Sequence, residues 1–181
     1  LKTNSTSQTM KIIKTKFKDL VLMQSKNHED NRGFFREIFI QKILKKNFVF
    51  DCMSQSKRNV LRGLHFQKQN PQGKFITVTE GEIFDVAVDL RTKSKTFGQY
   101  FSIKLSERSN CSIFIPPSFA HGFLCLSNKC KIYYKCTENR HEKSEKTIMW
   151  NDPKINIKWP NRNFILSKKD KHGEKLEKAI V

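Results

Sequence analysis

Short strand-like runs separated by turn residues recur about every ten residues along most of this chain, and few patterns have the period of a long helix. Glycine, proline and asparagine lie between the runs and predict turns. This spacing indicates an all-β sandwich or barrel. A short helix is expected at 41–46 and a terminal helix at 169–180. The predicted strands are 11–15, 20–23, 34–39, 49–54, 60–67, 74–79, 82–91, 97–105, 111–115, 120–126, 131–137 and 148–150.

The length of 181 residues suits one domain with a sizeable core. We expect a single domain over residues 10–181, because no linker or internal repeat divides it, and residues 1–9 read as a tag or a loose extension. No apolar run approaches the roughly 18 residues that cross a bilayer, and no secretory signal is recognisable. A cytoplasmic protein without a membrane partner is therefore expected.

The cysteines are five, an odd number, and contain no C-x-x-C pair. Without a secretion signal, reduced thiols are the better interpretation. Their spacings fit no zinc site, so we expect no metal to be bound by them. They are Cys52, Cys111, Cys125, Cys130 and Cys136.

The charge is strongly basic, with 35 lysines and arginines against 17 acids and a formal net charge of +18. Such a balance suits a polyanion-binding protein. However, the basic residues are scattered, and no nucleic-acid-binding module is recognisable. We expect a lysine-rich solvated surface and no nucleic-acid partner, with a basic cavity mouth that suits a nucleotide diphosphate.

Two histidines lie inside strand-like runs, His65 in 59–67 and His121 in 115–123. A titrating side chain in such a run is costly to bury unless it has a partner or a task. The two histidines therefore suggest a barrel with a polar interior. Strict alternation puts His65 and Arg62 on opposite faces, so Gly63 is predicted to mark a bulge if both reach one site.

Alternation along the other strands also predicts which side chains share a face. In 82–91 the apolar face must be core, and the opposite face carries Asp85 and Asp89. In 131–137, Tyr134 is predicted to point inward and Tyr133 outward. His121 shares the inward face of its strand, where a structural histidine hydrogen-bonded to Asp85 stays an alternative to a binding role.

Eight motifs in collinear order resemble the dTDP-4-dehydrorhamnose 3,5-epimerases, and the resemblance covers residues 10–170. It implies a cupin-like double-sheet jelly roll, a homodimer, and activity without a metal or organic cofactor. Members of the family invert carbon 3 and usually carbon 5 of a nucleotide-diphosphate-linked 4-keto-6-deoxy sugar, in deoxysugar biosynthesis for surface polysaccharide. The motifs are 32–37, 60–67, 72–74, 81–89, 116–123, 134–135, 150–152 and 159–170.

The resemblance also implies roles for single residues. Removing a proton next to a ketone needs a base and a group that stabilises the enolate. His65 matches the base and Asp170 the carboxylate that orients its imidazole, although Asp170 also fits a helix cap. Lys74 matches the cation beside the enolate oxygen, and Tyr134 the acid on the opposite face. The positions that bind the nucleotide sugar match Arg32, Glu37, Arg62, His121, Glu145 and Lys169.

Two segments depart from the family pattern. Phe50 stands where the family usually has a ligand-binding glutamine, and 138–141 replaces a tyrosine pair followed by proline. The nucleotide and the sugar, a hexose or a heptose, therefore stay open. A ketoisomerase or a single-carbon epimerase in the same barrel is the closest alternative. A metal-dependent cupin oxygenase is disfavoured because His65-Phe66-Gln67 lacks the H-x-H pair.

Overall fold

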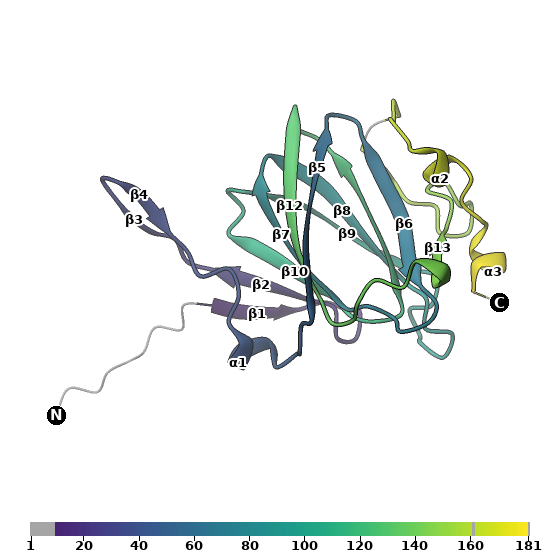
Figure 1. The fold of residues 1–181 in the computed structure, drawn as a ribbon, viewed down its shortest axis with the longest axis horizontal. Helices are drawn as coiled ribbons and strands as arrows, with labels where there is room; N and C mark the ends of the chain where they lie inside the picture. The colour runs from purple at the N-terminus through teal and green to yellow at the C-terminus, as the bar shows by residue number, and fades with distance from the viewer. Residues whose placement is uncertain (1–9, 161, 181) are drawn as a thin grey trace.

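The computed structural model describes residues 10–160 and 162–180, so the expected extension 1–9 lies outside the described residues. Two antiparallel sheets pack on each other (Figure 1). The six-stranded sheet has the order β1-β2-β10-β7-β12-β5 and the five-stranded sheet the order β13-β6-β11-β8-β9, which confirms the predicted all-β double-sheet fold. The strands are β1 (Met10–Lys14), β2 (Val21–Ser25), β5 (Phe50–Lys57), β6 (Leu61–Gln67), β7 (Lys74–Glu80), β8 (Glu82–Asp89), β9 (Tyr100–Ser106), β10 (Cys111–Ile115), β11 (Phe119–Cys125), β12 (Lys129–Cys136) and β13 (Glu145–Thr147).

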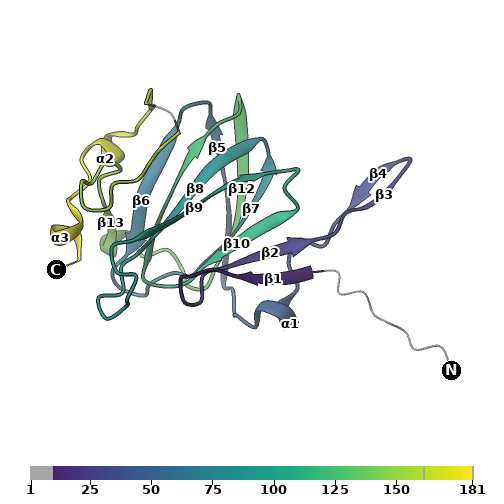
Figure 2. The ribbon, with the colours of Figure 1, turned by 180° about the vertical axis from the view of Figure 1, so that it is seen from behind.

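A separate hairpin projects from the body of the molecule (Figures 1 and 2). It pairs β3 (His28–Asp30) with β4 (Gly33–Phe35). The predicted strand 34–39 was too long, because β4 ends at Phe35 and an irregular segment then leads to α1 (Gln41–Leu44). Both strands of the hairpin are exposed over their whole length, Phe34 and Phe35 included.

The predicted terminal helix 169–180 was wrong. The structure has two short helices, α2 (Lys168–Lys171) and α3 (Leu176–Ala179), and the 3₁₀ turn η1 (Glu142–Ser144) precedes β13. Gly173 lies between the helices, against the backbone of Met149, where a Cβ atom would be 2.7 Å from the Met149 nitrogen. Glu174 then pairs with Ile148 in a parallel bridge. The chain leaves the helix because it must pair with this backbone.

Strand β8 is buried on both faces. Ala87 belongs to the larger core cluster, which lies between the two sheets. The opposite face, with Val86 and Val88, packs on the C-terminal segment, which lies beside β6 and β13 in Figure 2. The predicted apolar face is thus buried as expected, but under the C-terminal segment and outside the space between the sheets. This leaves the inner face of β8 free to carry Asp85 toward the interior.

A bulge at Gly63 brings two faces of β6 to one site, as predicted. His65 pairs with His121, whereas Arg62 pairs with Phe123, so β6 has one residue more than β11 between these pairs. Gly63 has φ of +124°, and a Cβ atom there would be 2.5 Å from the Cα of Gly122. Only glycine suits such a close approach of two backbones at positive φ.

Among the described helices, none has the length and the apolar character that a transmembrane helix requires.

Candidate active site

Two adjoining cavities, of about 520 and 440 Å³, form one site, which we call the active-site cavity. One lobe reaches the 165–170 segment, and the other reaches between the sheets to His121 and Tyr134. A combined space of this size suits a small-molecule ligand. The residues that line both lobes are Arg62, His65, Gln72, Lys74, Arg140 and Glu145.

His65 and Asp170 form a hydrogen-bonded pair in this cavity, with 2.6 Å between Nε2 and Oδ1. Asp170 also accepts hydrogen bonds from the Gly63 N–H and the Ser167 hydroxyl. Burial raises the pKa of Asp170, but these hydrogen bonds outweigh it and hold the pKa below its usual value. When the carboxylate accepts a hydrogen bond from the Nε2–H of His65, Nδ1 keeps its lone pair, as a base requires.

Asp170 is more than a helix cap. The N-cap of α2 is Ser167, whose hydroxyl accepts a hydrogen bond from the backbone N–H of Asp170. The cap therefore fixes the first turn of α2, and Asp170 is free to direct its carboxylate at β6.

Tyr134 lies on β12, in the sheet opposite His65. Its hydroxyl is 3.1 Å from the Ser54 hydroxyl, and its ring meets the His121 ring edge-on at 6.3 Å between centroids. Burial raises the pKa of Tyr134, so the phenol stays protonated at neutral pH. Tyr133 points outward and donates a hydrogen bond to Asp51, which confirms the predicted orientation of the two tyrosines.

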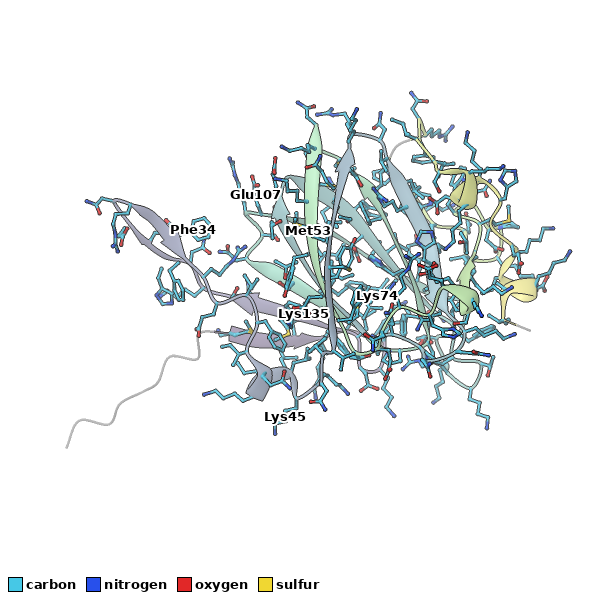
Figure 3. The ribbon with its side chains drawn as sticks, in the orientation of Figure 1. Phe34, Lys45, Met53, Lys74, Glu107 and Lys135 are labelled. Carbon is cyan, nitrogen blue, oxygen red and sulfur yellow. The ribbon has the colours of Figure 1, made fainter. Side chains whose placement is uncertain are left out.

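Lys74 opens β7 and lines both lobes. Figure 3 shows it within the body of the barrel. Burial holds the pKa of Lys74 below its usual value. The nearby Cys136, Cys52 and Glu145 act in the opposite direction but do not outweigh burial. Within residues 10–160 and 162–180 its ammonium group forms no ion pair within 4 Å, so its charge is directed at the cavity itself.

His121 and Asp85 form a second buried pair, with 2.7 Å between Nε2 and Oδ2. Both side chains are almost fully buried, and His121 lines the inner lobe. The predicted hydrogen bond between His121 and Asp85 is therefore confirmed, and the ring of His121 also faces the cavity. In the part of the chain that is described, no group of three or more His, Cys, Asp or Glu side chains is placed to hold a metal ion.

The mouth of the cavity is a charged cluster around Glu145. Its carboxylate accepts hydrogen bonds from Arg140, at 2.6 and 3.2 Å, and from Lys169, at 2.9 Å. The Arg140 bonds contribute most, and despite some burial the pKa of Glu145 falls to about 2. Arg62 lines both lobes and is held by the Ser56 hydroxyl and the Gln55 carbonyl. Arg140 was not predicted, and its only signal in the sequence is that it lies in a segment that departs from the family pattern.

Two predicted site residues lie away from the cavity of their own chain. Arg32 is on the β3–β4 turn, where it pairs with Asp30 and its side chain is 85% exposed. Glu37 follows β4, and neither residue lines the cavity. In Figure 3 the neighbouring Phe34 on the hairpin is well separated from Lys74.

Comparison with known proteins identifies relatives over almost the whole chain. A family model described as dTDP-4-dehydrorhamnose 3,5-epimerase matches residues 14–178. The dTDP-4-dehydrorhamnose 3,5-epimerase of Methanothermobacter thermautotrophicus is 44% identical over 179 residues, covering 94% of this chain and 97% of the relative. That of Salmonella typhimurium is 43% identical over 180 residues, covering 95% and 98%.

A solved structure supports the same relation. The dTDP-6-deoxy-D-glucose-3,5-epimerase of Legionella pneumophila, in complex with dTDP-4-keto-L-rhamnose, superposes with a TM-score of 0.89. It is 42% identical and covers 93% of each chain. The likeness confirms the predicted cupin-like jelly roll.

Proposed function

This chain belongs to the dTDP-4-dehydrorhamnose 3,5-epimerase family, and on that premise we propose that it inverts both carbon 3 and carbon 5 of a dTDP-linked 4-keto-6-deoxyhexose. The protein is an isomerase of nucleotide-linked sugars. The Legionella pneumophila relative, which was solved with dTDP-4-keto-L-rhamnose, supports the choice of substrate.

The proposed reaction is proton removal from one face of the sugar and proton return from the other. Nδ1 of His65 takes the proton from the carbon next to the ketone, and the electron pair moves to the carbonyl oxygen. The ammonium of Lys74 stabilises the resulting enolate. Tyr134 then gives its proton to the carbon from the opposite face, which inverts the centre. His65 releases its proton to solvent and Tyr134 takes one up from solvent, which restores both groups for the second carbon.

One observation carries this mechanism: His65 on β6 and the protonated phenol of Tyr134 on β12 line one cavity from opposite sheets. Beside them lies the ammonium of Lys74, which has no ion pair among the described residues. A base alone would only exchange the proton. A second proton donor on the other wall turns exchange into inversion.

We assign substrate binding to Arg62, His121, Glu145 and Lys169, and add Arg140, all of which line the cavity. Arg32 and Glu37 join them only if a second copy of the chain supplies its hairpin, so we propose a homodimer in which each hairpin reaches the partner's cavity. The exposed Phe34 and Phe35 on the hairpin support this arrangement, because exposed aromatic pairs are typical of interfaces.

The test is deuterium incorporation from deuterated water into dTDP-4-keto-6-deoxyglucose, followed by NMR. The wild type should incorporate deuterium at carbons 3 and 5 with inversion at both. His65→Asn and Asp170→Asn should lower exchange roughly 100-fold or more. Tyr134→Phe should keep exchange and lose inversion, whereas Tyr133→Phe, its outward neighbour, should behave as the wild type. A folded wild type that incorporates no deuterium would contradict the proposal.

The same assay distinguishes the proposed reaction from its two closest alternatives. Deuterium at one carbon only would indicate a single-carbon epimerase, and a keto group moved from carbon 4 would indicate a ketoisomerase. Repeating it with UDP- and GDP-linked forms tests the nucleotide, because Phe50 lines the inner lobe where the family usually has a glutamine.

A further inference from the structure

A third cavity, of about 500 Å³, lies outside the active-site cavity and shares none of its lining residues. It lies between the turn that joins β1 to β2 and the loop that joins β8 to β9. Five cationic side chains line it: Lys16, Lys18, Arg91, Lys93 and Lys95. We call it the lysine cavity.

The floor of the lysine cavity is built from a hydrogen-bonded network around the buried carboxylate of Asp89. The Asp89 carboxylate accepts hydrogen bonds from Arg91 Nε and Nη2, both at 2.8 Å, and from the hydroxyls of Ser94, at 2.7 Å, and Thr96, at 2.6 Å. Arg91 Nη1 also donates to the Lys18 carbonyl at 3.1 Å, which ties the two loops together. The cavity is therefore held in shape, and the charge of Asp89 is already balanced by Arg91.

None of the four lysines forms an ion pair with any described residue. Lys16 Nζ is 3.3 Å from the side-chain oxygen of Gln99 and lies over the Phe17 ring, 5.2 Å from its centroid, and neither contact supplies a negative charge. Besides Asp89, the carboxylate of Asp19 also raises the pKa of Arg91. Four ammonium groups around one concave surface repel each other, and a bound anion would relieve that repulsion.

We propose that the lysine cavity binds a compact anion with two or more phosphate groups. Its volume lies in the range of small-ligand sites, and ammonium groups bind phosphate as point charges without a fixed geometry. No aromatic ring lines the cavity, so nothing in it would stack on a nucleobase. The site is independent of the active-site cavity and of the proposed reaction.

The experiment is calorimetric titration of the full chain with inorganic pyrophosphate. Because pyrophosphate also suits the active-site cavity, the wild type should bind two per chain and Arg62→Gln should retain the one in the lysine cavity. In the Arg62→Gln background, Lys93→Gln with Lys95→Gln should weaken the remaining binding at least tenfold. The matched pair Lys42→Gln with Lys46→Gln, on and after α1, removes the same charge elsewhere and should leave it unchanged.

Three outcomes would overturn the proposal. A single pyrophosphate per chain that Arg62→Gln abolishes would mean binding in the active-site cavity only. Equal weakening by both lysine pairs would mean a general effect of net charge. Binding to phosphatidylglycerol vesicles that depends on Lys93 and Lys95, without binding of free pyrophosphate, would mean a membrane-surface contact. With Arg62 intact, the Lys93 and Lys95 substitutions should leave epimerase turnover at the wild-type rate.

Discussion

Glu145 holds two cations at the mouth of the active-site cavity, one from each side. Arg140 comes from the segment after β12 and Lys169 from α2. The planar guanidinium of Arg140 is held by two hydrogen bonds, so its side chain loses less conformational freedom when it binds a phosphate or a nucleobase. In the proposed complex, Glu145 keeps both cations in position at the mouth.

Arg140→Gln should therefore raise KM for the nucleotide sugar roughly tenfold and leave kcat nearly unchanged, as expected for a group that binds ground state and transition state alike. Steady-state kinetics measures both constants. Arg108→Gln, an exposed arginine that does not line the cavity, is the matched control. A loss in kcat without a change in KM would contradict a binding role for Arg140.

At the scale of elements, the bulge in β6 is the feature on which the site geometry depends. Gly63→Ala should destabilise the fold by about 3 kcal/mol or more, because the new methyl group would overlap the Gly122 backbone as well as strain φ. Gly98→Ala also has positive φ but meets only Leu176 Cδ2, at 3.5 Å, so it should cost about 1 kcal/mol. Urea unfolding measures both, and equal losses would refute the close-approach argument.

The β8–β9 loop depends on an ionised Asp89. Burial raises the pKa of Asp89, but hydrogen bonds from Arg91, Thr96 and Ser94 lower it to about 2 from 3.8. The stabilisation is present above about pH 4 and lost as pH falls toward 2, and the shift corresponds to about 2 kcal/mol.

Urea unfolding of the wild type and Asp89→Asn at several pH values tests this. The difference in unfolding free energy between the two proteins should be largest near pH 6 and shrink as the solution is acidified to pH 3 and below. A difference that stays constant with pH would show that the charge of Asp89 does not contribute.

Alternation along the strands predicted the inward positions of Tyr134 and His121 and the bulge at Gly63, because these follow from local geometry. The sequence does not reveal sheet order or the path of the C-terminal segment, since both depend on contacts between distant residues. The helix predicted at 169–180 failed for that reason: Gly173 and Glu174 follow the backbone of 148–149, which no local pattern indicates. Arg140 was not predicted because it lies in a loop whose sequence has no periodic pattern.

At the scale of the whole molecule, the position of the hairpin makes the proposed homodimer testable. Arg32→Ala and His65→Asn should each be nearly inactive alone. In a mixed dimer, the Arg32→Ala chain supplies an intact His65 and the His65→Asn chain an intact hairpin, so one of two sites works. Random mixing should restore about a quarter of wild-type activity. No recovery, with mixed dimers verified by mass spectrometry, would place Arg32 outside the partner's cavity.

His65 and Asp170 form a pair in the folded protein but are 105 residues apart in the chain, so the ribosome makes them at different times. A ribosome has made every strand of both sheets before it reaches Asp170 on α2. A growing chain can thus bury much of its core while His65 still lacks its hydrogen bond to the Asp170 carboxylate. With the proposed roles of His65 and Asp170, turnover should begin only after the C-terminal segment has emerged and packed on β8, so the onset of catalysis in a synthesis reaction would time the last folding step.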